Sequence, residues 1–454
     1  MAKKPNIVYL HAHDLGRYCE PFGYAIPAPN LMRLCHEGIF FRQCHSAAPS
    51  CAPSRAALVT GRWPHCNGML GLPSPSLGYQ LDDYQQHLGW WLKAQGYTCA
   101  LSGVQHVARE PMVDPHAVLP YDEWLTADDW DAPGIQRSMT APCAVEYLNR
   151  DHTQPFFLSI GLLDPHRDNK GDRATFVEST ATERAHDLDQ RARYVQPWPH
   201  MPDNPVTRSE MAAFIDGVCA MDDDIGRIMR ALNTTQRRND TLVIFTSDHG
   251  PGVAGMKCTL TDRGTGVPLI IRGPLDPSYG PSCDFTGGQV NDALLSQIDL
   301  YPTLCELIDA ATPDHVQGRS LMPLIRGEAD QINPHIFSEQ TYHWDASPRA
   351  QRAVRTQRYK YVRHVGEQAQ GVDPGPAQHW WRTQGYGQRP PPPEALYDLS
   401  FDPHEAHNLV DDEAYTDVVR ELTQTLDRWQ LDTNDPLLNG VPTPPALLPV
   451  EDPG

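Results

Sequence analysis

The chain has 454 residues, of which 40% are hydrophobic and 21% are charged, which is typical of a globular protein large enough for one α/β core and a smaller second domain. Its formal net charge of −20 argues against nucleic acid or a membrane surface as a partner, so any anion site must be a local positive pocket. The eleven cysteines are odd in number and form no C-x-x-C pair, so neither a disulfide framework nor a zinc knuckle is indicated.

The N-terminus leads directly into a short apolar segment at residues 7–10. This segment is too short for the hydrophobic core of a signal peptide, and no stretch of the sequence is long enough to span a membrane. Together with the cysteine usage, this favours a reducing compartment. We therefore expect a cytoplasmic protein; a periplasmic or lysosomal-type location would require that a leader had been removed.

Apolar segments that end in polar clusters recur along the first two thirds of the chain. Strands are expected at residues 7–10, 98–101, 156–161, 241–246 and 268–271. Helices are expected at residues 30–38 with Asn30 as N-cap, 84–93, 207–232 behind a Thr207–Glu210 capping box, and 293–307. This alternation predicts an α/β fold with a large, mostly parallel sheet and helices on both of its faces.

The pattern changes near residue 330. Short antiparallel strands are expected at residues 353–354, 359–362 and 396–398, followed by a packing helix at residues 414–431. Between them, residues 367–393 are rich in Gln, Gly and Pro and are expected to form a long loop, with Trp380, Trp381 and Arg382 as a candidate lid. We therefore predict a catalytic α/β domain at residues 1–330 and a smaller C-terminal α+β subdomain at residues 331–454.

The segment Cys51-Ala-Pro-Ser-Arg55 is the first candidate for chemistry. A lone cysteine is usually a small buried hydrophobic residue. Here Ser54 is a good N-cap, and a helix is expected to begin just behind it near Ala56. A thiol before a helix N-terminus, with Arg55 in the first turn, lies in a positive field that lowers the thiol pKa and favours anions.

Other polar clusters follow the expected strands. They contain His13 and Asp14, His106, His166, and Asp248 with His249. Taken singly, an Asp-His-Gly sequence is often a turn and a lone histidine is often structural. Because the carboxyl ends of parallel strands meet at one edge of a sheet, we expect these side chains to converge with Cys51.

The spacing C-x-P-S-R-x-x-x-x-T-G-R, from Cys51 to Arg62, resembles the signature of the type I sulfatases. The order of the clusters around Asp14, His106, His166, Asp248 and Lys257 is similar to that of this branch of the alkaline-phosphatase-like superfamily over nearly the whole chain. Within it, the likeness is closest to the heparan N-sulfatase (sulfamidase) group.

The resemblance implies one divalent cation. Its ligands would be Asp14, Cys51 as formylglycine, Asp248 and His249, with His13 as a further candidate that could equally point away. Oxygen-rich ligation makes Ca²⁺ the first expectation, with Mg²⁺ as an alternative. His13 and His249 stand where the family often has Asp and Asn, and two imidazoles would favour the softer Mn²⁺.

The resemblance also assigns catalytic roles. Cys51, oxidised to formylglycine by a separate maturation enzyme, would be the nucleophile as an aldehyde hydrate, and Arg55 would hold the hydrate. His106 would serve its second hydroxyl, His166 would protonate the leaving group, and Lys257 would contact the sulfate and the leaving-group oxygen.

Substrate contacts are predicted on less evidence. Val104 stands where the family usually has Lys, which makes the neighbouring Gln105 a candidate to compensate. Residues 339–344 are polar and aromatic and are expected where the two domains meet. Tyr342 and His343 in this segment are therefore candidates for contacting a sugar, although packing of the interface is an equally good interpretation.

The predicted function is hydrolysis of a sulfated sugar, with N-sulfated glucosamine as the first guess and an O-sulfated monosaccharide next. One alternative is a phosphodiester or phosphonate monoester hydrolase, because that group of the superfamily also uses Asp-His-Gly. A second is a catalytically silent anion-binding protein in which Cys51 stays a thiol. Homo-oligomer formation is left open.

Overall fold

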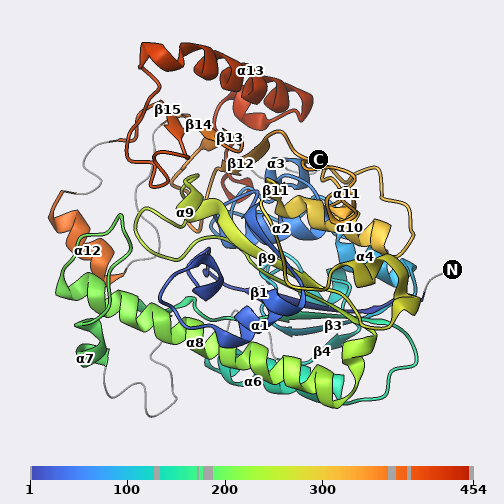
Figure 1. Cartoon of the computed structure of the whole chain (residues 1–454). Coiled ribbons are helices and arrows are strands. Elements are labelled where there is room, and N and C mark those ends of the chain that lie inside the picture. Colours follow the sequence, from blue (N-terminus) through green and yellow to red (C-terminus); the bar gives the residue numbers. More distant parts are fainter. Residues whose placement is uncertain are drawn as a thin grey trace.

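The computed structural model describes residues 3–126, 133–170, 173–176, 188–366, 375–385 and 390–448. Figure 1 shows a large sheet covered by helices on both faces, with a smaller layer that carries the C-terminal helix beside it. Within the described part of the chain, no helix is both long enough and apolar enough to cross a bilayer. None of the eleven cysteines, which all lie among the described residues, forms a disulfide. The cytoplasmic location stays a prediction.

The large sheet has nine strands in the order β10-β2-β9-β8-β1-β5-β3-β4, with β11 also paired to β2. Its strands are β1 (Asn6–Ala12), β2 (Ile39–His45), β3 (Thr98–Gly103), β4 (Glu123–Trp124), β5 (Phe156–Gly161), β8 (Thr241–Ser247), β9 (Gly266–Arg272), β10 (Gln289–Asn291) and β11 (Leu295–Ser296). Only β9 runs against its two neighbours, β2 and β8. The prediction of a mostly parallel sheet is confirmed.

The sheet is buried on both faces, which explains the continuous apolar runs in its strands. In β1, Val8 and Leu10 pack into one hydrophobic cluster, whereas Ile7 and Tyr9 pack into another on the opposite face. One face is covered by α1 (Pro29–Glu37), α6 (Pro133–Leu148) and α8 (Pro205–Thr234). The other is covered by α2 (Cys51–Thr60), α4 (Leu88–Ala94) and α10 (Leu300–Leu307).

A second, four-stranded antiparallel sheet follows in the chain, in the order β12-β13-β14-β15. Its strands are β12 (Ile336–Gln340), β13 (Gln351–Arg355), β14 (Tyr359–His364) and β15 (Glu394–Asp398), and α13 (Thr416–Asp432) packs against it. The amide of Glu339 donates to the carbonyl oxygen of Ala47, so β12 lies against the segment that leads to Cys51. The domain boundary at residue 330 stays a prediction, although the two sheets lie on either side of it.

The remaining elements are short. They are the helices α3 (Pro64–Asn67), α5 (Pro115–Val118), α7 (Leu188–Ala192), α9 (Asp262–Thr265), α11 (Met322–Ile325) and α12 (Pro376–Thr383), and the two-stranded sheet of β6 (Arg167–Lys170) and β7 (Arg173–Phe176). The predicted loop at residues 367–393 is wrong where α12 forms, and Trp381 of this helix packs against the core beside α8. Residues 367–374 and 386–389 of that loop lie outside the described residues.

Several predicted helix starts are wrong. Helix α1 begins at Pro29, and the Asn30 amide instead donates to the Asp222 carboxylate at 2.8 Å. Helix α8 is capped by Asn204, whose side chain accepts from the Thr207 amide, so the Thr207–Glu210 box does not form. His87 separates the predicted helix at 84–93 into a 3₁₀ turn and α4.

Candidate active site

Cys51 is the first residue of helix α2 rather than part of a loop in front of it. Pro53 fits the first turn because its missing N–H would have no partner there. Ser54 is not the N-cap: its hydroxyl donates to the carbonyl oxygen of Asp248 at 2.6 Å. Ser54 therefore joins the Cys51 helix to the end of β8, and the thiol is 2% exposed at the positive end of the helix.

Asp14 and Asp248 come from the ends of the neighbouring strands β1 and β8. The amide of Asp14 donates to Asp248 Oδ1 at 2.9 Å, and the amide of Leu15 donates to the Ser247 hydroxyl at 3.1 Å. Asp14 adopts a left-handed backbone conformation with φ of 58°, which is less costly for Asp than for most residues. These bonds hold two carboxylates side by side at the carboxyl edge of the sheet, as predicted.

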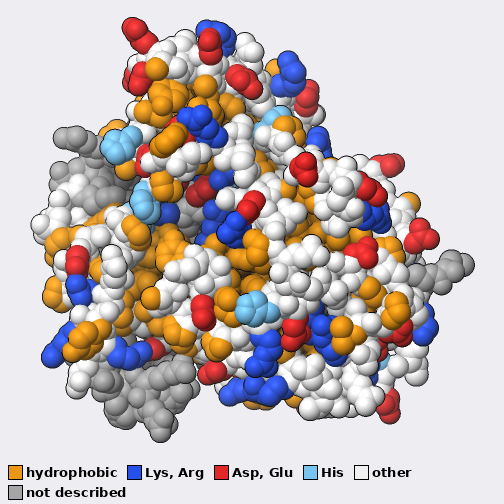
Figure 2. Space-filling model, in the orientation of Figure 1, with side chains coloured by type: hydrophobic (Ala, Val, Ile, Leu, Met, Phe, Trp, Pro, Cys, Tyr) orange, Lys and Arg blue, Asp and Glu red, His pale blue; other side chains and the backbone are white. Residues whose placement is uncertain are grey.

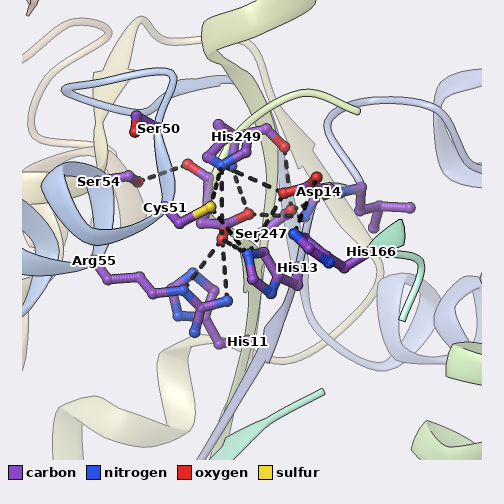
Figure 3. A network of polar contacts seen from close by, with 12 residues as sticks. His11, His13, Asp14, Ser50, Cys51, Ser54, Arg55, His166, Ser247 and His249 are labelled. Atoms are coloured by element: carbon purple, nitrogen blue, oxygen red, sulfur yellow. Dashed lines mark hydrogen bonds and ion pairs between the residues drawn. The ribbon is translucent and has the colours of Figure 1, made fainter. Parts of the chain in front are cut away.

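His13 and His249 turn their Nε2 atoms toward the same point (Figure 3). His13 Nε2 lies 3.1 Å from Cys51 Sγ and 3.4 Å from Asp248 Oδ2. His249 Nε2 lies 3.3 Å from Cys51 Sγ and 3.4 Å from Asp14 Oδ1. The orientation of His13, which the sequence left open, is thus toward the cluster.

These five residues have the geometry of a metal site. One donor atom from each of them lies within 4.8 Å of all the others, and all five side chains are buried. Ligands on opposite sides of a divalent cation are roughly 4–5 Å apart, so a single ion fits among these donors. Cys51 contributes its Sγ to this set of donors.

Electrostatics prepare the two histidines for ligation. Burial, and then nearby positive groups, hold the pKa of His13 well below its usual range, and burial also lowers the pKa of His249. Both imidazoles are therefore neutral near pH 7. The Nδ1 proton of His249 is donated to the Gly250 carbonyl oxygen at 2.8 Å, which leaves the Nε2 lone pair directed at the cluster.

Two buried cations balance the two carboxylates. Arg55 Nε lies 3.1 Å from Asp248 Oδ2, and Lys257 Nζ lies 3.0 Å from Asp14 Oδ2. Lys257 is 1% exposed, Arg55 is 2% exposed, and Arg55 helps to hold the pKa of Asp248 below its usual range, against the effect of burial. The site is thus locally neutral within an acidic protein, so a negative substrate group is not repelled there.

His166 and His106 complete the ring of histidines around Cys51. The rings of His13 and His166 are 4.1 Å apart, and those of His13 and His106 are 4.8 Å apart. His166 donates its Nδ1 proton to the Arg167 carbonyl oxygen at 2.6 Å, so its Nε2 faces the cluster, 3.9 Å from Asp14 Oδ2. An imidazolium in this position has one proton, at Nε2, to give to a group bound beside Cys51.

The sulfatase family model matches residues 5–310, which is more than half of the chain. The chain belongs to the sulfatase family. A second model, described as the C-terminal region of N-sulphoglucosamine sulphohydrolase, matches residues 259–371. The predicted fold class and the predicted enzyme class are therefore confirmed.

The sulfatase has curated relatives that align over most of its length. Human N-sulphoglucosamine sulphohydrolase is 29% identical, over 96% of this chain and 91% of the relative. The Δ4,5-hexuronate-2-O-sulfatase of Bacteroides thetaiotaomicron is 25% identical, over 94% and 89%. A solved structure described as a complex with its substrate D-glucosamine-2-N,6-O-disulfate superimposes with a TM-score of 0.72 at 20% identity, over 96% and 99%, and this likeness establishes the fold.

Two residues proposed for substrate contacts form hydrogen bonds with the backbone of this sulfatase. The Gln105 amide donates to the Ala108 carbonyl oxygen at 2.7 Å and accepts from two backbone amides of the same loop, so it stabilises that loop. Tyr342 is 4% exposed and donates its hydroxyl hydrogen to the Pro442 carbonyl oxygen. Their polar groups thus have partners within the protein, and the substrate contacts predicted for these two residues stay predictions.

His343 lies closer to the chemistry. Its Nδ1 is 2.9 Å from the hydroxyl of Ser50, the residue that precedes Cys51, and its side chain is buried. It therefore links the segment after β12 to the start of α2. Its predicted contact with a sugar stays a prediction.

Sequence reasoning missed Arg137, which lies in α6. Its Nε donates to Asp164 Oδ1 at 2.7 Å and its Nη2 donates to the His166 carbonyl oxygen at 2.6 Å, while Nη1 pairs with Asp168. One guanidinium thus holds three points of the segment that carries His166. An arginine inside a helix gives no sequence signal for this role, and only the position of Asp164 and His166 after a strand suggested that the segment mattered.

Proposed function

We propose that this sulfatase releases sulfate from a sulfated sugar, with N-sulfoglucosamine as the first candidate substrate. The observation that supports this substrate is the match of residues 259–371 to the C-terminal region of N-sulphoglucosamine sulphohydrolase. This region contains β12 and β13, and β12 lies against the segment that leads to Cys51. An O-sulfated monosaccharide is the second candidate, because one relative is named as a 2-O-sulfatase of a hexuronate.

The sulfatase family uses a formylglycine made from the cysteine and one divalent cation, and the buried cluster around Cys51 suits both. A bound cation would lower the pKa of the hydroxyl of the formylglycine hydrate that attacks sulfur, and would offset the negative charge of the sulfate. A formylglycine-generating enzyme is therefore a required partner in maturation. We keep Ca²⁺ as the expected ion, and Mn²⁺ is the second candidate because both His13 and His249 face the cluster.

The remaining residues supply charge and protons. Arg55 holds the Asp248 carboxylate on one side of Cys51, and Lys257 holds Asp14 on the other, where its ammonium group can contact the sulfate. His166 Nε2 carries the proton that the departing amine or alcohol needs. His106, whose ring lies beside that of His13, is the residue that we propose takes the proton of the second hydroxyl. General acid or base assistance of this kind contributes roughly 10²–10⁴-fold in rate.

The decisive measurement for the nucleophile is peptide mass spectrometry on protein made in its native host. Conversion of Cys51 to formylglycine removes sulfur and gives a fixed mass loss on that peptide. An unmodified Cys51 in that material would refute the nucleophile assignment and favour a silent anion-binding protein. A cysteine found after expression in a host without the maturation enzyme would carry no such weight.

The substrate is tested by comparing kcat/KM for N-sulfoglucosamine, 6-O-sulfated glucosamine, an aryl sulfate and a phosphodiester. We expect the sulfamate to be preferred among the sugars and the phosphodiester to be the poorest substrate. Preferential cleavage of the phosphodiester would overturn the proposal. Removal of metal with a chelator should also lower the melting temperature, and the added ion that restores it best identifies the natural one.

A further inference from the structure

A cavity of about 500 Å³ lies outside the catalytic cluster, and no metal-site residue lines it. Its wall combines parts of the chain that are far apart in sequence, namely the loop after β1, the start of α9, the residues after β13 and the turn after β15. The lining residues that carry the argument are Arg17, Tyr18, Tyr24, Arg263, Arg355 and Ser400. A volume of this size accommodates a monosaccharide.

The cavity is rich in positive charge. Asp262 is shared by three cations: Arg355 Nη2 lies 2.9 Å from its Oδ2, Lys360 Nζ lies 2.5 Å from its Oδ1, and Arg17 Nη1 lies 3.5 Å from its Oδ2. Lys360 has a second carboxylate partner, Glu405, at 2.8 Å. Three cations therefore pair with only two carboxylates. Figure 2 shows basic side chains gathered with a few acidic ones near the middle of the face that it draws.

Arg263 is a fourth cation, and it forms no ion pair with any residue that the structure describes. Its Nε donates to the Gly255 carbonyl oxygen at 3.3 Å, and its Nη1 donates to the His404 carbonyl oxygen. Four cations against two carboxylates leave an excess of two positive charges beside the cavity. The chain as a whole has a net charge of −20, so this positive charge is a local feature of the cavity. It makes the cavity suited to binding an anion.

The cavity also offers aromatic surface and neutral hydrogen-bond donors. The rings of Tyr18 and Tyr24 are 4.9 Å apart, and Phe22 lies beside them in the wall. Neither tyrosine hydroxyl forms a hydrogen bond with a residue in the described part of the chain. Aromatic rings beside arginines match a ligand with an apolar sugar face and a charged substituent.

We infer that this cavity is a second ligand site, which binds a sulfate group carried by a sugar. Two segments connect the cavity to the catalytic cluster. Arg17 follows Asp14 by three residues, and the amide of Gly250, next to His249, donates to the carbonyl oxygen of Gly264, the residue after Arg263, at 2.8 Å. The same anionic chemistry occurs in the sulfate that the enzyme releases. The inference uses no step of the proposed reaction, so either can fail without the other.

The test is isothermal titration calorimetry on the full-length, metal-loaded protein in a Cys51→Ala background, which prevents turnover. The probes are inorganic sulfate, a sulfated heparin disaccharide and the same disaccharide without sulfate. We expect two sites for the sulfated disaccharide and none for the desulfated one. If sulfate alone occupies the second site as tightly as the disaccharide does, the anion alone is the ligand and the sugar part of the inference is wrong.

Three variants assign the second site to this cavity. Arg263→Gln removes a charge that no carboxylate balances and should weaken one of the two sites about tenfold, leaving the other unchanged. Ser400→Asp adds a carboxylate to the lining without removing a contact, and should have the same effect even if Arg263→Gln folds poorly. Arg227→Gln, at an exposed position of α8 outside the cavity lining, makes an equal change of charge and should leave both sites intact.

Three results would overturn the inference. The first is a single site for the sulfated disaccharide in the Cys51→Ala parent. The second is equal weakening by Arg263→Gln and Arg227→Gln, which would reflect net charge alone. The third is a second site that survives both Arg263→Gln and Ser400→Asp.

Discussion

Arg137 is expected to act as a positioning residue for His166. Its guanidinium bonds to Asp164, to Asp168 and to the His166 carbonyl oxygen, so Arg137→Met releases the segment that holds the general acid. The imidazole itself would be unchanged. The variant should therefore be slower in the step in which the leaving group takes a proton, whereas its binding of the sulfate should change little.

The size of the effect follows from the geometry. General acid assistance is worth roughly 10²–10⁴-fold, and a displaced imidazole loses part of it, so kcat for a sugar sulfamate or sulfate should fall about 10²-fold. An aryl sulfate with a good leaving group needs little protonation and should lose less than about fivefold. The free energy of unfolding should fall by about 2–4 kcal/mol, because two carboxylates lose their partner. The loss is no larger because these carboxylates, at 16% and 17% exposure, regain contact with water.

The assay compares both substrates across pH for the parent, Arg137→Met, His166→Gln and the double variant. We expect the double variant to be no slower than His166→Gln alone, because both changes remove the same contribution. Arg137→Lys should recover part of the loss, and Arg150→Met, just after α6 and 41% exposed, is the matched control. An equal loss on sugar and aryl substrates, or additive effects in the double variant, would refute the positioning role.

Two further predictions concern ion pairs formed by residues of the second sheet. Burial lowers the pKa of His65, but the Glu339 carboxylate at 2.9 Å outweighs it and raises the pKa to about 10, so this contribution to stability is full below about pH 6.5 and disappears as pH rises to 10. The difference in unfolding free energy between the parent and His65→Gln, measured in urea, should shrink across that range. Asp435→Asn removes one of the two carboxylates that pair with the fully buried Arg352, the other being Glu339 at 3.2 Å, and should cost about 1.5–3 kcal/mol, whereas Asp427→Asn, at a pair that is half exposed, should cost less than about 1 kcal/mol.

The strands of the large sheet could be predicted well because burial on both faces gives them unbroken apolar runs. Phe156–Gly161 matches β5, and the run from Thr241 matches β8 with one further residue. Since polar clusters follow these strands, their convergence at one edge could also be predicted. The reversed direction of β9 could not, because an apolar segment reads the same in either direction.

Helix starts and side-chain orientations were less predictable because they depend on partners far away in the sequence. Ser54 looked like an N-cap, yet it bonds to the backbone of Asp248, 194 residues away, and the helix begins three residues earlier. Asn30 is likewise taken by Asp222. Gln105 follows the same principle at short range, since its loop closes around its amide. In each case a local pattern identified a polar residue but not the group it would bind.

His13 offers a direct test of which ion the cluster prefers. It faces the cluster, but its Nδ1 has no hydrogen-bond partner among the described residues, whereas the Nδ1 of His249 donates to a carbonyl oxygen. A ligand without such support is held less firmly, so replacing it should be tolerated.

His13→Asp adds a hard, charged oxygen ligand and should raise the affinity for Ca²⁺ relative to Mn²⁺ by about tenfold or more. Metal content after dialysis against an equal mixture of the two ions measures this preference without reference to activity, and His116→Asp, at an exposed position, controls for the added charge. An unchanged Ca²⁺ to Mn²⁺ ratio in His13→Asp would show that His13 does not contact the ion, whatever its orientation beside Cys51.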